Sequence, residues 1–334
     1  MIDDKLISLE KCSQIFLNTF FGSELPPTYN VNFFKFLENY YSSKLELLKL
    51  SEDVLLIYLI KKLNKKKFLI TSGKFGNLGI SLKKELSLID IESLENKIKI
   101  FTKINKIDVF SISINPYSFR YAKKFDNRLF VNINHDYNIC SLNEVFEKNK
   151  ENTNIKLYSN YNLRKSLRDL RSYNYSYVID KDPVNLERWY DNCYLKRMKE
   201  INGSPWNFNF FKKLLSNKNS QFMYVKSSNA ISGGIFFLCN NYAAEIFSIA
   251  SPKEFLKKGL NNFLVDSLYK FLKNKNINFV NWQRSSDENV RKFKIKWKAK
   301  TVSLKTLIFK KNELGKSEIV KKFTNLYVYP YEYL

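Results

Sequence analysis

The stretch Ala230–Leu272, AISGGIFFLCNNYAAEIFSIASPKEFLKKGLNNFLVDSLYKFL, decides the fold class. It opens with two apolar runs, Ala230–Leu238 and Tyr242–Ala250, that have the length and composition of strands. Ser251-Pro-Lys-Glu254 follows with the spacing of a capping box and a proline at the first helical position. Leucine and phenylalanine then recur at helical spacing as far as Leu272, which predicts one long helix packed on the sheet.

The flanking segments continue this alternation of strands and helices. Downstream, Ile277–Trp282 and Thr301–Phe309 are predicted strands, with a polar turn and a basic segment between them. Upstream, Asn162–Arg171 is a predicted basic amphipathic helix because its leucines share one face. Asp182-Pro183 offers an N-cap and a first-turn proline for a second helix, and a third is predicted near Asn209–Leu215. This order predicts a mixed α/β domain.

The first half of the chain carries similar signals. We expect a helix over Phe33–Leu48, followed by a hairpin of the strands Val54–Ile60 and Phe68–Thr71. Gly73–Gly79 holds three of the nine glycines of the chain, which marks a loop that turns sharply or approaches a ligand. Further strands are predicted at Ile107–Ile114 and Arg128–Ile133.

The length of the chain and its polar segments predict two domains. A chain of 334 residues with 44% hydrophobic residues is long and apolar enough for two hydrophobic cores. The polar segment Lys148–Thr153 separates the two halves. We therefore expect domains at 1–150 and 151–334.

The composition also predicts a cytoplasmic protein without a metal centre. The longest apolar run, Val54–Ile60, is far shorter than the about 20 residues of a membrane span, and the start carries two acids where a secretory signal would be basic. The four cysteines form no CxxC pair, and His135 is the one histidine. We therefore expect neither a thiolate zinc site nor a histidine-rich metal centre.

The charge balance favours anionic partners. There are 56 Lys and Arg residues against 32 Asp and Glu, a formal net charge of +24. This excess favours nucleic acids, nucleotides, phospholipid surfaces or pyrophosphate-linked substrates. The lysines are accompanied throughout by Asn, Ile, Phe and Tyr, a mixture that an AT-rich genome would produce without selection for any ligand.

Six segments of the second half, in this order, resemble the C-terminal GNAT-like domain of the FemAB family and of related acetyltransferases. They are Leu163–Arg168, Ala230–Phe237, Ser248–Ser251, Gly259–Leu264, Val280–Ser285 and Val290–Trp297. The resemblance implies a mixed-sheet α/β fold of two tandem GNAT-like acyl-CoA N-acyltransferase domains. It also implies that the first domain is a degenerate copy and that the acceptor binds between the two.

The most specific segment of the resemblance is Phe293-Lys294 followed by Trp297, similar to a phenylalanine-lysine, tryptophan-glycine signature of the family. The resemblance implies that Lys294 neutralises charge on the acyl carbonyl oxygen or holds a phosphate of the donor. Lys298 stands where the family usually has glycine.

Glu245 is the one acid within an apolar strand-like run, on the same face as Ala243 and Phe247. Burial there would suit a general base that takes a proton from the attacking amine. The alternative is a solvent-facing carboxylate paired with a lysine.

GNAT proteins hold the phosphates of the donor with backbone N–H groups at a helix N-terminus. The resemblance places Lys257, Lys258, Gly259, Asn261 and Asn262 in this role. Of the usual RxxGxG/A pattern only Gly259 remains, and the alternative is a glycine inside a core-packing helix.

Arg284 follows a predicted strand, where its guanidinium would clamp phosphate or carboxylate. Arg168, on the basic helix, would do the same for a nucleotide-linked or lipid-linked acceptor. Gly76 and Gly79 would line the acceptor site. Each of these has a plain alternative, a solvated basic face for the arginines and a tight connection for the glycines.

The leading interpretation is an N-acyltransferase that carries an acyl group from acyl-CoA to an amine on a cell-surface glycan or nucleotide-sugar precursor. The first alternative is an aminoacyl-tRNA-dependent transferase of the FemAB type; the charge favours it, and the lack of a long heptad segment for a helical arm counts against it. The second alternative is a non-catalytic protein that binds nucleic acid. The expected partners are anionic or lipid-linked acceptors, tRNA, and an anionic membrane at the periphery.

Overall fold

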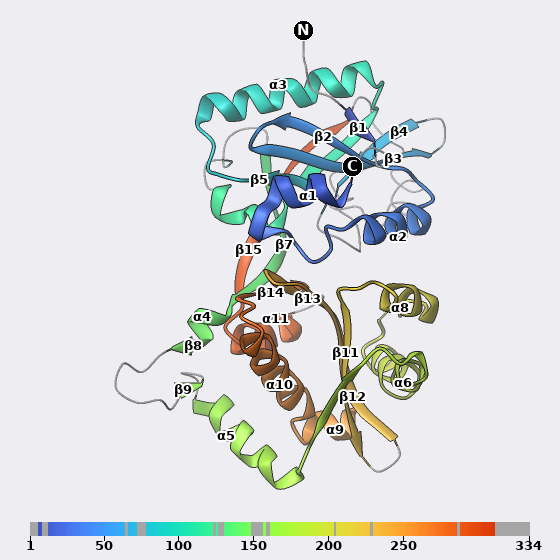
Figure 1. The fold of residues 1–334 in the computed structure, drawn as a ribbon, viewed down its shortest axis with the longest axis vertical. Coiled ribbons are helices and arrows are strands. Elements are labelled where there is room, and N and C mark those ends of the chain that lie inside the picture. Colours follow the sequence, from blue (N-terminus) through green and yellow to red (C-terminus); the bar gives the residue numbers. More distant parts are fainter. Residues whose placement is uncertain are drawn as a thin grey trace. The chain divides into compact units, whose positions relative to one another are not determined.

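A computed structural model describes the chain as two compact units (Figure 1). The described residues are 6–8, 13–63, 66–71, 78–122, 125, 130–147, 156–157, 161–203, 205–227, 230–285 and 288–310. The first unit comprises the described residues within Met1–Gly22, Thr28–Asp136 and Val302–Leu334. The second comprises those within Ser23–Pro27 and Tyr137–Thr301.

This division differs from the boundary expected at residue 150. The strand β7 (Phe130–Ser141) runs through the junction at 136/137, so the polar segment that suggested a boundary lies beyond it. The last strand, β15 (Lys300–Lys310), pairs antiparallel with β6 (Val109–Ser113) of the first unit. That pairing joins segments nearly 200 residues apart, which composition along the chain cannot reveal.

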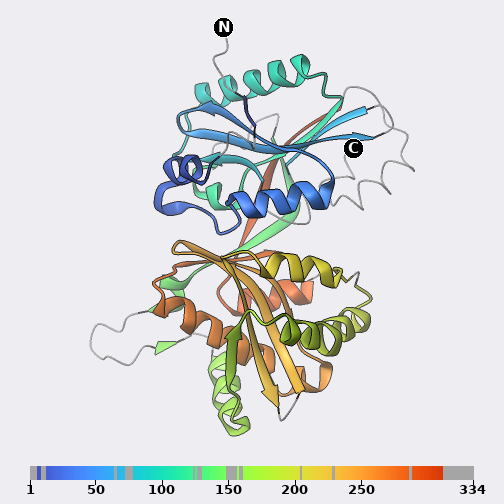
Figure 2. The same ribbon diagram turned by 45° about the vertical axis from the view of Figure 1, so that its right-hand side comes forward.

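The first unit is a sheet with helices on both faces. In Figures 1 and 2, α3 lies on one face, and α1 and α2 lie on the other. The strand order is β1-β2-β3-β4-β6-β15, with β5 beside β3. The other elements of this unit are β1 (Leu6–Ser8), α1 (Gln14–Phe21), α2 (Val31–Tyr41), β2 (Leu45–Ser51), β3 (Val54–Leu63), β4 (Lys66–Ile70), β5 (Gly79–Leu82), α3 (Leu88–Ile104) and the 3₁₀ helix η2 (Pro116–Tyr121). A further 3₁₀ turn, η1 (Gly22–Glu24), follows α1.

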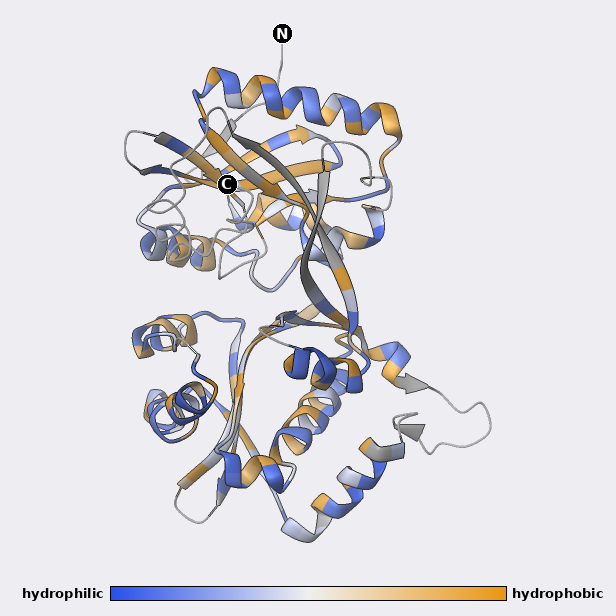
Figure 3. Cartoon of the chain, turned by 180° about the vertical axis from the view of Figure 1, so that it is seen from behind, coloured by the Kyte–Doolittle hydropathy of each residue, from blue (hydrophilic) through white to orange (hydrophobic). Residues whose placement is uncertain are grey.

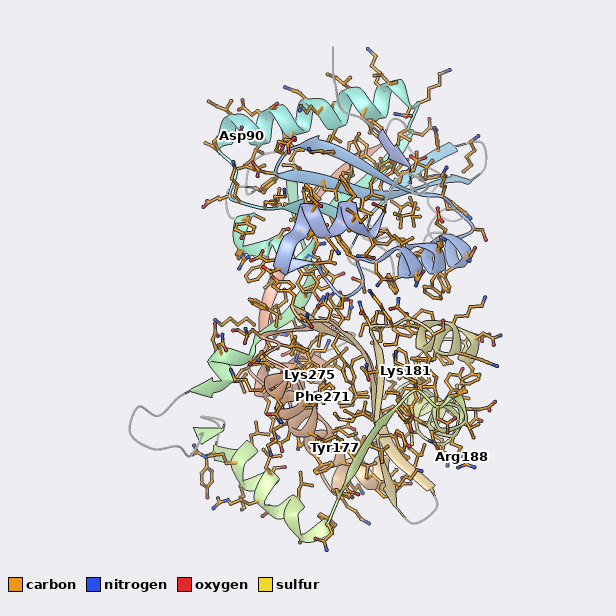
Figure 4. The ribbon with its side chains drawn as sticks, viewed as in Figure 1. Asp90, Tyr177, Lys181, Arg188, Phe271 and Lys275 are labelled. Carbon is orange, nitrogen blue, oxygen red and sulfur yellow. The ribbon has the colours of Figure 1, made fainter. Side chains whose placement is uncertain are left out.

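The predicted hairpin of the first unit is confirmed, and the predicted helix over Phe33–Leu48 is too long. Strands β3 and β4 pair antiparallel from Leu59↔Ile70 to Leu63↔Lys66. Helix α2 ends where Ser42 adopts a left-handed conformation, with φ of 47°. Residues after it enter β2, because pairing with β3 satisfies their backbone groups and buries their leucines. At α3, Ser87 and Asp90 form a capping box; Figure 4 labels Asp90 in the first turn.

The second unit is also a sheet between helices. Its strand order is β7-β14-β13-β12-β11-β10, in which β13 and β14 pair parallel and the other neighbours antiparallel. Helices α6 and α8 lie on one face, and α10 and α11 on the other (Figure 1). The strands are β8 (Phe146–Glu147), β9 (Lys156–Leu157), β10 (Tyr177–Asp180), β11 (Ser220–Ser227), β12 (Ala230–Cys239), β13 (Ala243–Ala250) and β14 (Phe279–Arg284). The helices are α4 (Leu142–Val145), α5 (Tyr161–Asp169), η3 (Leu170–Tyr173), α6 (Pro183–Trp189), the π-helix η4 (Tyr190–Leu195), α7 (Lys196–Glu200), α8 (Phe208–Leu215), α9 (Lys253–Lys257), α10 (Leu260–Asn274) and α11 (Glu288–Lys296).

The predicted helix starts of the second unit are partly confirmed. The Asp182 carboxylate accepts from the backbone N–H of Val184, which caps α6 as expected. The predicted capping box at Ser251 is wrong. Ser251 is buried, and its hydroxyl donates to Asn261 Oδ1 at 2.7 Å. The predicted long helix is divided into α9 and α10 at Gly259, which has a φ of 75°.

Hydrophobic side chains hold α10 and α11 on the sheet. Leu264, Leu268 and Leu272 of α10 pack in one buried cluster with Ile235 of β12 and Val280 of β14. In Figure 3, hydrophobic and hydrophilic residues alternate along α10, as expected of a helix with one buried side. In the described parts of the chain, no helix combines the length and the apolar character that a membrane crossing requires.

Candidate functional site

The site is built where β13 and β14 part. Their parallel ladder has three pairs: Ala243↔Phe279, Ala244↔Val280 and Glu245↔Asn281. Beyond the last pair, β13 continues to Ala250 and β14 to Arg284, but the two strands no longer pair. The end of a parallel ladder leaves space at the carboxyl ends of its strands, where α/β sheets bind ligands.

Glu245 lies at the last pair of this ladder. It is fully buried, and its Oε2 accepts a hydrogen bond from Gln283 Nε2 at 2.8 Å. Of the two alternatives that the sequence left open, a buried carboxylate and a solvent-facing one, the structure shows the buried one. Phe247, Ser248 and Ile249 follow it along β13 and are partly exposed, so the strand reaches the surface just past the carboxylate.

Gln283 holds the kink that ends the ladder. Its φ is 60°, a left-handed conformation that costs a residue other than glycine about 1–2 kcal/mol. Its backbone N–H donates to Asn281 Oδ1 at 2.9 Å, and its carbonyl accepts from Asn138 Nδ2 at 3.2 Å. Strained backbone held by several hydrogen bonds is typical of functional sites.

Lys294 approaches the same kink from α11. Its side chain is buried, and Nζ donates to the carbonyls of Trp282 at 2.8 Å and Gln283 at 3.3 Å. Two carbonyl oxygens stabilise a charged ammonium. Gln283 of β14 therefore contacts both side chains: its side-chain amide donates to Glu245, and its backbone carbonyl accepts from Lys294.

The residues that follow Lys294 end α11 in a turn, in which the N–H groups of Trp297 and Ala299 donate to the Lys294 carbonyl. Trp297 is fully buried, and Tyr269 donates to its carbonyl at 3.1 Å. Lys298 has a φ of 64°, so it adopts the conformation that favours glycine at the position where the family usually has glycine. Lys298 is therefore expected to be less stable at this turn than a glycine would be, although the turn keeps the left-handed backbone.

The predicted donor-binding residues lie farther along the chain from Glu245, around the start of α10. Lys257 and Lys258 are exposed. Gly259 packs against Leu170, whose Cδ2 lies 3.0 Å from where a Cβ would be. Asn261 accepts from Ser251. Asn262 donates to Ser166 of α5 at 3.1 Å, so α5 and the turn after it cover the first turn of α10.

The predicted acceptor residues are divided between the two units, with Arg168 and Arg284 in the second and Gly79 in the first. Arg168 is exposed on α5. Arg284 ends β14, opposite Tyr137 of β7, and its side chain lies outside the described part, as does Gly76. Gly79 begins β5 of the first unit with a φ of 119°, and a Cβ there would overlap the carbonyl oxygen of Ser113. A close backbone approach thus accounts for this glycine.

Sequence reasoning missed three linked amides, namely Gln283, which contacts Glu245, and Asn138 and Asn281, which bond to the Gln283 backbone. Asn138 and Asn281 are fully buried, and the described residues include no hydrogen-bond partner for Asn281 Nδ2. Neutral amides have no charge pattern that marks them in a sequence. The available signal was the polar pair Asn281 and Gln283 at alternate positions of an otherwise apolar strand.

The described cysteines do not supply a nucleophile. Burial raises the pKa of Cys140 and of Cys193 to about 12 each, and that of Cys239 to about 11. Their thiols are therefore protonated at neutral pH, and thiolate is the reactive form. Within the described residues, no group of three or more His, Cys, Asp or Glu side chains is arranged to hold a metal.

Comparison with known proteins identifies the fold. No family model matches the sequence, and no curated protein matches it. The solved structure of FemX matches with a TM-score of 0.63 at 8% identity, over 92% of this chain and 97% of that one. The chain has a FemAB-like, GNAT-type fold. This confirms the predicted fold class.

Two further structures match this FemAB-like chain. L-PGS from Bacillus licheniformis matches with a TM-score of 0.55 at 13% identity, over 94% of this chain and 97% of that one. A C-terminal domain from Agrobacterium fabrum, described as that of a lysylphosphatidylglycerol synthetase, matches with a TM-score of 0.52 at 10% identity, over 83% and 86%. Identities this low establish the fold alone.

Proposed function

We propose that this protein is an acyltransferase of the FemAB type that joins an activated acyl group to an amine, with Glu245 as the proton acceptor. The observation that carries the proposal is that two buried ionisable side chains both bond to Gln283, Glu245 to its side-chain amide and Lys294 to its backbone carbonyl. Burying an ionisable side chain costs free energy. Buried ionisable side chains at the point where β13 and β14 stop pairing therefore mark a candidate active site.

In the proposed step, the amine nitrogen attacks the acyl carbonyl carbon. A C–N bond forms, and the bond from that carbon to the ester oxygen or thioester sulfur of the donor breaks. The nitrogen gives one proton to the Glu245 carboxylate, which returns it to the departing oxygen or sulfur. The Lys294 ammonium adds positive charge near the oxygen that becomes negative in the transition state. The partly exposed segment after Glu245 is the proposed path of approach.

The preferred donor in this proposal is aminoacyl-tRNA. GNAT proteins bind the phosphates of acyl-CoA at an open helix N-terminus. In this chain the corresponding helix is α10, and its start is contacted by Ser166 of α5 and by Leu170, which follows α5. The similar structures named FemX and lysylphosphatidylglycerol synthetase support an aminoacyl donor. The second candidate donor is acyl-CoA, which the exposed Lys257 and Lys258 beside the left-handed Gly259 favour.

The proposed acceptor is an anionic molecule with a free amine. A cell-surface glycan, a nucleotide-sugar precursor and a lipid-linked precursor are the three forms that we propose, made in the cytoplasm or at an anionic membrane surface. The net charge of +24 supports an anionic acceptor.

The test is transfer of a labelled acyl group. Bulk tRNA charged with labelled amino acids, or labelled acetyl-CoA, is mixed with a nucleotide-linked, lysine-containing muramyl pentapeptide or with phosphatidylserine vesicles, because each of these acceptors is anionic and has a free amine. We expect label from charged tRNA in one acceptor, and loss of transfer in Glu245→Gln. Transfer from acetyl-CoA alone would establish the second donor. Absence of transfer from both donors to either acceptor would overturn the proposal.

A further inference from the structure

The outer face of α5 and the segment from α9 to the start of α10 form one basic surface in the second unit. Six exposed cations define it, and we name it the α5–α9 basic face: Arg164, Lys165, Arg168, Lys253, Lys257 and Lys258. The same helices contribute only two exposed acids, Asp169 and Glu254. The face is therefore strongly positive.

The two segments are held side by side by direct contacts. Leu163 and Leu170 are buried, and Leu167 packs against the core cluster that includes α10. Ser166 accepts a hydrogen bond from Asn262, and Leu170 touches Gly259. The inner side of α5 is thus fixed on α10, which leaves its charged side outward; hydrophilic colours predominate along α5 in Figure 3.

The cations of this face are largely available to a ligand. Lys165, Arg168, Lys253 and Lys257 are exposed, and none of the four has an ion-pair partner among the residues that the structure describes. Some cations elsewhere on the surface are paired, as Arg197 is with Glu200 at 2.9 Å. Unpaired cations gathered on one face repel one another, and a polyanion relieves that repulsion.

Exposed aromatic rings lie beside these cations. Tyr173, 47% exposed at the end of η3, stacks on Tyr175 with ring centroids 5.5 Å apart at 19°. Tyr175 in turn contacts Phe263 of α10 at 5.5 Å. Tyr161 is 60% exposed at the start of α5. An exposed ring backed by a second one is a platform on which a nucleic-acid base stacks.

These observations favour RNA over a lipid surface. Among the described side chains of 161–173 and 253–262, the exposed large hydrophobic ones are tyrosines, Tyr161 and Tyr173. Membrane-binding helices instead expose bulky aliphatic or tryptophan side chains that enter the acyl region. Lysine and arginine with tyrosine is the combination that follows a sugar-phosphate backbone and stacks its bases.

We propose that the α5–α9 basic face binds the RNA of the aminoacyl-tRNA donor, an inference that rests on the proposed function. Strand β13 leads from Glu245 to the start of this face, and the five steps from Glu245 to Ala250 span about 17 Å at about 3.3 Å each. The unpaired 3′ end of a tRNA crosses this interval while the phosphates of the stem contact the face. Tyr173 stacks a base of that single-stranded end.

The test compares two triple variants of the full chain with equal loss of charge. One carries Lys165→Gln, Arg168→Gln and Lys257→Gln on the face. The control carries Lys212→Gln, Lys213→Gln and Lys218→Gln, three exposed lysines at α8. Binding of uncharged bulk tRNA is measured by fluorescence anisotropy from 50 to 200 mM salt. Uncharged tRNA makes this measurement independent of catalysis.

We expect the face variant to bind tRNA about tenfold or more weakly near 0.1 M salt, and its salt slope to fall by about 2, because each lost phosphate contact lowers the slope by about 0.7–0.9. The control keeps the wild-type affinity and slope. Equal weakening in both variants would show binding by net charge alone, and absence of tRNA binding by the wild type would equally overturn the inference.

Two further arms separate the rivals. Tyr173→Ala is expected to weaken binding of a short single-stranded RNA about tenfold while Tyr173→Phe preserves it, because stacking needs the ring and not the hydroxyl.

Anionic phosphatidylglycerol vesicles replace RNA in the second arm. If the face variant loses vesicle binding but keeps RNA binding, the surface is a membrane contact and the inference is wrong. If the face variant keeps both wild-type tRNA binding and wild-type transfer from charged tRNA, the α5–α9 basic face is not the RNA-binding surface, and the proposed function still stands.

Discussion

The two units contain the same parallel ladder with different chemistry at its end. In the first unit, β4 and β6 pair over Phe68–Ile70 and Val109–Ser111, and α3 connects them. In the second, β13 and β14 pair over Ala243–Glu245 and Phe279–Asn281, with α9 and α10 between them. Each ladder has three pairs and closes a strand–helix–strand crossover.

The first unit fills the end of its ladder with neutral groups. The Ser113 N–H donates to Thr71 Oγ1 at 2.7 Å, and Gly79 packs on the Ser113 carbonyl. Asn115 Nδ2 donates to both Tyr29 and Ser81. The second unit places Glu245 and Lys294 at the corresponding point. Neutral groups satisfy one another inside a core at little cost, whereas buried charges cost several kcal/mol. Under the proposed function, the second ladder is therefore the one that we expect to take part in catalysis.

The largest expected effect is on transfer by Glu245→Gln. The substitution keeps the shape and an oxygen that accepts from Gln283, but it removes the proton acceptor, so we expect transfer to fall about 10³-fold. The matched control is Glu46→Gln in the first unit, where the carboxylate accepts from Tyr58 at 2.7 Å. Initial rates measure both. Equal rates for Glu245→Gln and wild type would remove the chemical difference between the ladders.

The next effect is on stability at the neutral ladder. In Gly79→Ala, the new Cβ would overlap the Ser113 carbonyl, and the φ of 119° is strained for alanine, so we expect a loss of about 3 kcal/mol or more. Gly22→Ala, with a φ of 55° and nothing within 4 Å of the new Cβ, adds backbone strain without overlap, so we expect a smaller loss of about 1–3 kcal/mol. Urea unfolding measures both. Similar losses would contradict the close packing that fills the first ladder.

The sequence predicted most of the second unit because its apolar periodicity is strong. The strands around β12 and β13, the start of α6 and the buried Glu245 follow from alternation, a proline and one acid in an apolar run. The split of the expected long helix was missed because Ser251 is buried and bonds to Asn261 rather than capping a helix. Tertiary contacts of this kind leave no local pattern.

The candidate site was predicted through its charges and missed in its amides. Glu245 and Lys294 stand out by residue type, whereas Gln283 matters through a left-handed backbone that no sequence rule places there. The start of α10 was predicted as a donor site from a family pattern. The contact of Leu170 with Gly259 depends on α5, about 90 residues earlier in the chain, and could not be predicted.

A third effect separates two buried asparagines. In Asn115→Ala, Tyr29 and Ser81 lose a donor and the Tyr117 N–H loses an acceptor, so we expect a loss of about 2 kcal/mol with unchanged activity per folded molecule. In Asn281→Ala only the Gln283 N–H loses its acceptor, so the loss is nearer about 1 kcal/mol while transfer falls. Paired unfolding and rate measurements check this. The reverse pattern would place the functional ladder in the first unit.

The smallest expected effect is that of substituting Gln283, whose left-handed backbone lies just beyond the second ladder. Gln283→Gly relieves a left-handed conformation that Gln283→Ala keeps, so the glycine variant should be more stable than the alanine variant by about 1 kcal/mol. Both variants lose the hydrogen bond to Glu245, so both should transfer about tenfold more slowly, mainly in kcat. Thermal unfolding and steady-state rates separate the two roles of the residue. If glycine restores the wild-type rate, the bent backbone alone positions the site, and the side-chain contact with Glu245 contributes nothing to transfer.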